Sequence, residues 1–382
     1  MMHQVLRGMA WNHSRALPPL VTTAQRFEEL FPSVRILWEK RTLHEFGHAS
    51  VVDLAKMFDL IIVDHTMMGD AHATGCLIDL STLIPVSALD EIRADSLGPC
   101  FDSYMFEGSL YALPIDAAAP AASFRPDLLR AAGFETPHTW AEVLALARLG
   151  FVVMPGFPPD LFLNFMGLCV SLGGDCSIPD QLFDADAALA SFDLLQQLAG
   201  LLPAETFERN PIAVYERMAN GEGVAYCPFA YTYSNYSRDG FGRHALEFKA
   251  PPEIYGKPIR TVLGGTGIAM SARCAAREVA LDYCLYIAGQ DCQRTLYGIC
   301  GGQPARRSAW EDPVLNSLTR DFFRRTQSSI ENAYVRPRFA GYAPFQEKAG
   351  VPLVRLLRRE LEPARALEHI EQLYREAIGG GA

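Results

Sequence analysis

Residues 1–65 alternate short apolar runs with amphipathic stretches, and this order restricts the chain to few folds. The run "DLIIVDH" at 59–65 is apolar on both faces, which is typical of a strand buried in a parallel sheet. Two earlier strands are predicted at 3–11 and 34–40, with helices over 18–31 and 50–58. Strands separated by such helices imply a parallel sheet with right-handed crossovers, and therefore an α/β fold.

Further along, the pattern predicts a hairpin within 103–116, with its turn at Glu107 and Gly108. One short helix is expected to begin at Pro126, and Thr139 is expected to cap the next. Strand character returns in "RTVLGGTGIAMS", and the C-terminal part is mostly helical. Because no repeat or low-complexity linker separates the parts, the domains are expected to be interleaved.

The size and charge of the chain favour a small-molecule partner. A chain of 382 residues suggests two domains or one large two-lobed body. With 34 Lys and Arg against 44 Asp and Glu, the net charge of −10 argues against nucleic acid or an anionic membrane as partner. No run approaches the ~18 apolar residues of a membrane-spanning helix, so no membrane insertion is expected.

The cysteines and the N-terminal sequence bear on the compartment. The nine cysteines are scattered without a C-x-x-C pair, which favours buried free thiols in a reducing environment. The first residues show no secretory leader pattern. The expected location is therefore cytoplasmic, with a periplasmic location as the alternative if a leader has been removed.

The segment "TLHEFGHASVV" contains the H-E-x-x-H spacing of zinc peptidases in His44, Glu45 and His48. Such a site needs a third ligand. Val51 and Leu54 stand where one class of these enzymes requires Gly and His, and no suitable acid-bearing helix follows. We therefore predict no metal, no cofactor and no complete catalytic motif, and we expect a protein that is not an enzyme.

Four segments, in order along residues 5–345, carry a family resemblance: "FDLIIVDHTMMGDAHATGCLIDLSTL", "FEGSLYALPID", "SFRPDLLRAAGFETPHTWAEVLALA" and "EVALDYCLYIAGQDCQRTLYGICGGQPARRSAW". This series resembles the solute-binding proteins of ABC importers, in particular the carbohydrate-binding class related to maltose-binding and glycerol-phosphate-binding proteins. The resemblance implies a type II periplasmic-binding-protein-like fold, with two interleaved α/β lobes, a hinge and a ligand cleft between the lobes. The expected lobes are 1–113 with 260–310, and 114–259 with 311–382. A monomer is expected, with ABC permease subunits as a further partner.

Candidate ligand contacts follow the strand ends, where ligands gather in open α/β sheets. After the first strand, Trp11 could stack on a ligand, and His13 or Arg15 could bind an oxygen or a carboxylate. Asp64 and His65 follow the third strand, and an acid there is costly unless it is paired or faces a polar cleft. The alternatives are that Trp11 only packs, that Arg15 only begins a helix, and that Asp64 caps one. The position of Asp64 resembles that of an acid that binds sugar hydroxyls in the family.

The remaining candidates lie later in the chain. Asp116, where the chain should cross to the second lobe, could bind ligand or cap the crossing. Tyr231 and Tyr233 resemble the aromatic region of the family's second lobe. Gly264 and Gly265 belong to a predicted close-approach loop, and Arg338 is suited to clamp a carboxylate or phosphate. Core packing, an ordinary turn and a solvated arginine are the respective alternatives.

The resulting hypothesis is a solute-binding protein that captures a small polar ligand, sugar-like or carboxylate-bearing, for an ABC-type importer. One alternative is a cytoplasmic enzyme or sensor on the same scaffold, with His13, Asp64 and His65 as acid–base groups. The other is the zinc peptidase.

Overall fold

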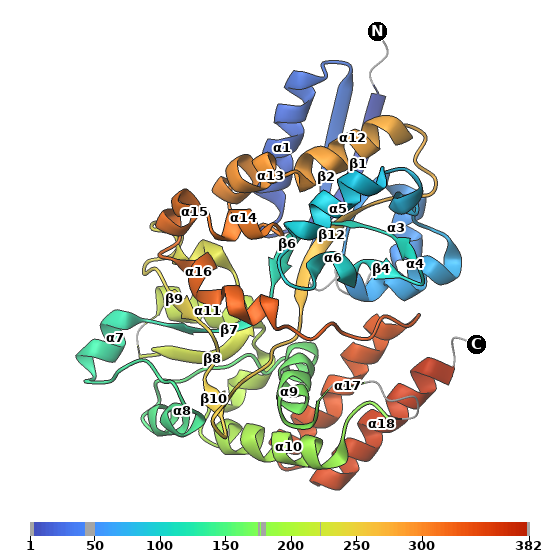
Figure 1. The fold of residues 1–382 in the computed structure, drawn as a ribbon. Coiled ribbons are helices and arrows are strands. Elements are labelled where there is room, and N and C mark those ends of the chain that lie inside the picture. Colours follow the sequence, from blue (N-terminus) through green and yellow to red (C-terminus); the bar gives the residue numbers. More distant parts are fainter. Residues whose placement is uncertain (1–3, 43–49, 175, 177–180, 222, 380–382) are drawn as a thin grey trace. The chain divides into compact units, whose positions relative to one another are not determined.

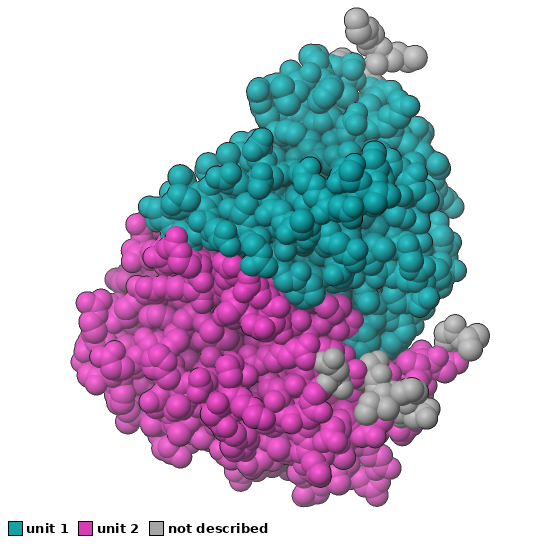
Figure 2. Space-filling model, viewed as in Figure 1, with its two compact units in different colours: residues 1–118, 264–318, 337–343 teal, residues 119–263, 319–336, 344–382 magenta. Residues whose placement is uncertain are grey.

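The computed structural model describes residues 4–42, 50–174, 176, 181–221 and 223–379. The chain forms two compact units, each assembled from three separate segments (Figure 2). Unit 1 consists of 1–118, 264–318 and 337–343, and unit 2 of 119–263, 319–336 and 344–382. The bounds of the units differ from those of the expected lobes: 114–118, 311–318 and 337–343 lie in unit 1, and 260–263 lies in unit 2.

Unit 1 is built on a five-stranded sheet with the order β2-β1-β3-β12-β6 (Figure 1). Its strands are β1 Gln4–Trp11, β2 Val34–Arg41, β3 Leu60–Val63, β6 Leu113–Ala118 and β12 Gly264–Met270. The first three strands pair in parallel, as the alternating pattern predicts. Strand β12 is antiparallel to both of its neighbours. A segment far along the chain therefore enters the sheet between β3 and β6.

The helices of unit 1 are α1 Leu17–Leu30, α3 Val51–Met57, α4 Met68–Thr74, α5 Val86–Ala94, α6 Cys100–Ser103, α12 Arg277–Ala288, α13 Gln290–Cys292, α14 Arg307–Trp310 and α15 Pro313–Leu318. The predicted hairpin is confirmed as β4 Met105–Phe106 and β5 Ser109–Leu110. Glu107 and Gly108 both have positive φ, as a two-residue type I′ turn requires.

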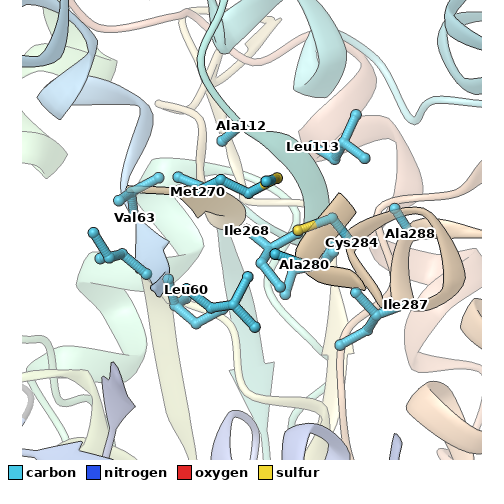
Figure 3. Close-up of a cluster of buried hydrophobic side chains, with 14 of the residues drawn as sticks. Leu60, Val63, Ala112, Leu113, Ile268, Met270, Ala280, Cys284, Ile287 and Ala288 are labelled. Carbon is cyan, nitrogen blue, oxygen red and sulfur yellow. The ribbon is translucent and has the colours of Figure 1, made fainter. Parts of the chain in front are cut away.

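Part of the core of unit 1 lies between its sheet and α12, and residues of α1, α3 and α4 belong to the same buried cluster. All four residues of β3 are buried, which explains why that run is apolar on both faces. Figure 3 shows Leu60 of β3, Ile268 of β12, and Cys284 and Ile287 of α12 as members of one buried cluster. Removing each large aliphatic side chain from water contributes about 1.5–3 kcal/mol, so these contacts hold the strands at fixed positions.

Unit 2 contains a three-stranded antiparallel sheet with the order β8-β7-β9. Its strands are β7 Pro120–Phe124, β8 Tyr226–Tyr231 and β9 Glu247–Lys249, with a small ribbon of β10 Glu253–Ile254 and β11 Lys257–Pro258. The helices are α7 Pro126–Ala131, α8 Trp140–Ala147, α9 Pro158–Gly173, α10 Ala185–Ala199, α11 Pro211–Asn220, α16 Phe322–Glu331, α17 Tyr342–Leu357 (which begins in the last segment of unit 1) and α18 Pro363–Gly379. The predicted helix starts are confirmed: α7 begins at Pro126, and Thr139 forms a capping box with Glu142.

Aromatic side chains form much of the core of unit 2. Phe165 of α9 stacks on Phe192 of α10, with ring centroids 4.7 Å apart. Phe162, on the same helix, meets Phe345 of α17 edge to face. These ring contacts join α9 to the next helix in the sequence, α10, and to α17 in the C-terminal part of the chain.

Two leucines of the unit 1 sheet test how much of its stability the core supplies. Leu60 is fully buried, whereas Leu37 of the edge strand β2 is 55% exposed. We expect Leu60→Ala to lower the free energy of unfolding by about 2–5 kcal/mol, and Leu37→Ala to change it by less than about 0.5 kcal/mol. Urea denaturation of the two variants measures the difference. Equal effects would show that the sheet is not held by the core described above.

Candidate functional site

The carboxyl ends of the parallel strands in unit 1 form a polar edge. Because β12 runs antiparallel to β3 and β6, its amino end lies at this same edge, with Gly267 opposite Val63 and Gly264 opposite Ala118. Eight of the predicted residues lie in these strand ends or in the turns that directly follow them: Trp11, His13, Arg15, Asp64, His65, Asp116, Gly264 and Gly265. Their role as ligand contacts stays a prediction.

Arg15 and Asp116 form a buried, bidentate ion pair across this edge. The Arg15 Nε donates to Asp116 Oδ2 at 2.9 Å, and its Nη2 donates to Oδ1. The two residues are only 4% and 1% exposed. On the side of Asp116, the Ala117 backbone N–H donates to the Gln303 carbonyl, and the Gln303 side-chain amide donates to the Ala117 carbonyl. The pair therefore ties the segment after β1 to β6 in one geometry.

Burial and pairing act on the Asp116 carboxyl in opposite directions. Burial raises its pKa, and the positive charge and hydrogen bonds of Arg15 oppose that rise. A buried charge is tolerated only when a partner and hydrogen bonds compensate it, so the two side chains behave as one neutral unit.

His13 lies in the turn between β1 and α1 and is held as a neutral imidazole. Burial, reinforced by the nearby Arg15 charge, lowers its pKa from 6.5 to about 4. The Arg15 backbone N–H donates to His13 Nδ1 at 3.0 Å. Since Nδ1 is the acceptor, the neutral ring carries its proton on Nε2. At neutral pH this residue offers a hydrogen-bond donor without a charge.

Asp64 and His65 differ in how far their side chains are exposed to solvent. Asp64 caps the short helical turn His65–Met67 by accepting a hydrogen bond from the Thr66 N–H at 3.2 Å, and its side chain remains 27% exposed. His65 is fully buried, with Nδ1 3.1 Å from Asp64 Oδ1 and its ring edge to face with Tyr104. The capping alternative is therefore observed, and Asp64 is the member of the pair with an accessible carboxylate.

The start of β12 requires glycine at one position. Gly265 has φ +99°, and a Cβ there would lie 2.2 Å from the Asp116 carbonyl oxygen. The backbones of Gly265 and Asp116 therefore approach each other closely, as expected for a glycine segment. Gly264 and Gly265 belong to β12 itself, whereas the sequence predicted a loop before the strand. The next residue, Thr266, is 5% exposed, and its hydroxyl has no hydrogen-bond partner among the described residues.

Three predicted residues have different surroundings. In unit 2, Tyr231 donates from its hydroxyl to the Val262 carbonyl at 3.1 Å, and the buried Tyr233 packs on another tyrosine. In unit 1, Arg338 Nη1 donates to the Ser103 and Met105 carbonyls at 2.9 and 2.5 Å, and its guanidinium lies over the Phe106 ring. Each of these side chains makes structural contacts, and ligand binding by them stays a prediction.

Sequence reasoning missed two polar residues on α9 of unit 2. Asp160 has neither a hydrogen bond nor an ion pair from its side chain to any described residue, and burial raises its pKa to about 7. One turn later, Asn164 is 7% exposed, and its amide nitrogen has no partner among the described residues. Their i, i+4 spacing puts them on one helix face. The signal in the sequence is a pair of polar residues in the otherwise apolar stretch "PPDLFLNFMG". With Thr266, they join the candidate set.

The described residues give no support to a metal centre. His44, Glu45 and His48 lie outside the described residues. Within the described ranges, no group of three His, Cys, Asp or Glu side chains is placed to hold a metal ion. No helix in the described part of the chain is long and apolar enough to cross a membrane.

Two α/β units with interleaved segments and a polar strand-end edge define a two-lobed, periplasmic-binding-protein-like protein. Residues 53–320 match the family model described as bacterial extracellular solute-binding protein. The chain belongs to this family, which is one of binding proteins.

Particular proteins agree with this assignment. The chain is 30% identical over 122 residues to the mannitol-binding protein of Pseudomonas aeruginosa, a match that spans 31% of this chain and 27% of that protein. Its fold is similar to that of an ABC transporter solute-binding protein from Agrobacterium radiobacter K84 in complex with ribitol (TM-score 0.82, 21% identity, 99% of each chain covered). It is also similar to maltose-bound T. maritima MalE3 (TM-score 0.82, 18% identity, 97% of this chain and 99% of that chain covered).

The family corrects the expected location. Because the matched family is extracellular, the cytoplasmic location expected from the cysteines is wrong. Seven of the nine thiols are buried and the other two are partly buried. Burial raises the pKa of the thiols of Cys100, Cys227 and Cys284. Because the thiolate is the reactive form, such thiols are inert, and their number says little about the redox compartment.

Removing one member of the buried ion pair should be costly. We expect Arg15→Met to lower the free energy of unfolding by about 3–5 kcal/mol, because it leaves an uncompensated buried carboxylate. The matched control is Arg93→Met, which breaks the exposed pair with Asp102 and should cost less than about 1 kcal/mol. The double variant Arg15→Met/Asp116→Leu should recover much of the loss. Urea denaturation measures all three, and similar losses for the Arg15 and Arg93 variants would contradict the role of the pair.

The lowered pKa of His13 predicts a pH dependence of stability. The unfolded chain takes up this proton near pH 6.5 and the folded chain only near pH 4, so protonation favours unfolding. Stability should therefore fall as the pH drops from about 6.5 to about 4. In His13→Asn, whose amide oxygen can still accept the Arg15 N–H, the fall between pH 7 and 4.5 should be about 1–3 kcal/mol smaller. Melting temperatures across this range test it, and parallel curves for the two proteins would contradict it.

Proposed function

We propose that the protein binds a small, uncharged, polyhydroxylated solute, such as an acyclic polyol, without converting it, and delivers it to an ABC-type importer as a monomer. The observation that carries the proposal is the buried ion pair of Arg15 and Asp116. Because each charge compensates the other, the Arg15 guanidinium is not available to attract a ligand carboxylate.

The other groups at this edge suit hydroxyl ligands. His13 is a neutral donor, and the buried Thr266 hydroxyl can both donate and accept. Asp64 presents a partly exposed carboxylate, which accepts hydrogen bonds from hydroxyls and repels anions. Trp11, at the end of β1, adds an apolar ring. This combination favours sugar-like ligands over the carboxylate-bearing ones that the sequence left open.

Unit 2 adds groups of the same character. Asp160 and Asn164 have unsatisfied hydrogen-bonding capacity on one face of α9. An unsatisfied buried amide costs about 1–3 kcal/mol, and a ligand hydroxyl would remove that cost. We propose both as solute contacts, together with Tyr231 and Tyr233, whereas the contacts of Arg338 favour a structural role.

The relatives support the same chemical class. One is named for mannitol and one was solved with ribitol, both acyclic polyols, and a third carries maltose. The match to the mannitol-binding protein spans 27% of that protein, so the choice of polyol rests on the site chemistry together with these names.

Calorimetric titration with D-mannitol, ribitol, maltose and gluconate tests the ligand class. We expect a polyol to bind with one site per chain and gluconate to bind at least tenfold more weakly, because Asp64 repels its carboxylate. Thr266→Val, which keeps the side-chain shape, should weaken polyol binding by about 3- to 10-fold through the loss of one hydrogen bond.

The control Thr74→Val, at an exposed site on α4, should leave the affinity unchanged. Tighter binding of gluconate than of mannitol would overturn the proposed class. Equal affinities for the wild type and Thr266→Val would remove Thr266 from the site.

A further inference from the structure

Unit 2 has a surface cavity of about 360 Å³ whose lining shares no residue with the proposed solute contacts. It is formed by residues of α7, by the loop before β9 with the first residue of that strand, and by Arg320, which precedes the N-cap of α16. The lining residues are Pro126, Asp127, Arg130, Asp239, Gly240, Gly242, Arg243, His244, Ala245, Glu247 and Arg320. Small-molecule sites have volumes of about 300–1,000 Å³, so the cavity is large enough for a compact ligand.

The lining carries uncompensated positive charge. Its three acids are Asp127, Asp239 and Glu247, and each is paired with an arginine. Two of these partners, Arg125 and Arg325, come from outside the lining. They neutralise acids of the cavity without using its own arginines.

Two guanidiniums of the lining are therefore left without an acidic partner among the described residues. Arg130 donates one hydrogen bond from Nε to the Pro126 carbonyl at 3.3 Å, and its ion-pairing capacity is unused. The side chain of Arg243 has no hydrogen bond or ion pair to any described residue. The side-chain hydrogen bonds from Arg125 lower the pKa of Asp127 to about 2, so this carboxylate stays ionised and paired. The balance of the cavity is cationic in a chain whose net charge is −10.

The loop that carries Arg243 is fixed in place. The Arg243 backbone N–H donates to Asn220 Oδ1 at 3.0 Å, and the His244 backbone N–H donates to the Ala219 carbonyl at 2.9 Å. A Cβ at Gly242 would lie 2.9 Å from that of Ala219, so the loop packs directly on the end of α11. The backbone of this loop therefore needs little ordering when a ligand binds, and the ordering cost is that of the exposed Arg243 side chain.

We propose that this cavity is a second binding site, for a compact dianionic oxyanion of the phosphate type, held by Arg130 and Arg243. Guanidinium groups donate two parallel hydrogen bonds to the oxygens of such an anion, and two arginines match its two charges. The imidazole of His244 supplies a further nitrogen in the lining. The site is separate from the uncharged solute site in both its residues and its chemistry.

Calorimetric titration of the whole protein with inorganic phosphate, at constant ionic strength in chloride, tests the proposal. We expect saturable binding at one site, weakened about tenfold or more in Arg130→Gln/Arg243→Gln because the charge-assisted hydrogen bonds are lost. Arg148→Gln removes an exposed arginine of unit 2 outside the lining and should bind phosphate like the wild type. Polyol binding, measured in the same samples, should be equal in all three proteins.

The proposal fails if phosphate binding is not saturable, or if the double variant binds phosphate as the wild type does. Arg243→Lys keeps the charge but removes the planar fork, so its affinity should lie between those of the wild type and Arg243→Gln. An affinity of Arg243→Lys no better than that of Arg243→Gln would overturn charge as the basis of binding. Because phosphate and polyol are titrated separately, failure of this site is distinguishable from failure of the proposed solute function.

Discussion

The buried ion pair of Arg15 and Asp116 is the interaction on which the polar edge of unit 1 depends. It joins the turn after β1 to β6, across 101 residues of sequence. Burying either charge alone would cost several kcal/mol, so the pair fixes both segments in one arrangement. It also neutralises two charges at the edge, and we propose that this suits the edge to neutral hydrogen-bonding ligands.

Strand β12 completes this edge from far along the chain. Its amino end pairs with the carboxyl ends of β3 and β6, and the positive φ of Gly265 lets its backbone approach that of Asp116 closely. The same strand brings to the edge the Thr266 hydroxyl, which has no hydrogen-bond partner in the described part of the chain. We propose that groups left unsatisfied by folding, here and at Asn164 of α9, contact the solute, because a ligand can lower the cost of their burial.

The two proposed sites differ in how their charges are balanced. At the sheet edge, an arginine and an acid of the same site compensate each other. In the cavity of unit 2, Arg125 and Arg325 compensate the acids from outside, and this leaves Arg130 and Arg243 unpaired among the described residues. Counting charged residues near a site would miss this difference, because the net charge that a ligand meets depends on which partners each group already has.

The sequence by itself determined the local elements and the family. The apolar run of β3, the Glu107-Gly108 turn, and the helix starts at Pro126 and Thr139 follow from short-range sterics and hydrogen bonding, so each was predictable from its own residues. Only the tertiary structure decided that Arg15 pairs with Asp116, that His65 is buried while Asp64 is not, and that Thr266 has no hydrogen-bond partner among the described residues. These outcomes depend on burial and on contacts between segments that are far apart in the chain, such as the 101 residues between Arg15 and Asp116. No local pattern encodes either one, because the same residue is a ligand contact or a structural one according to what packs against it.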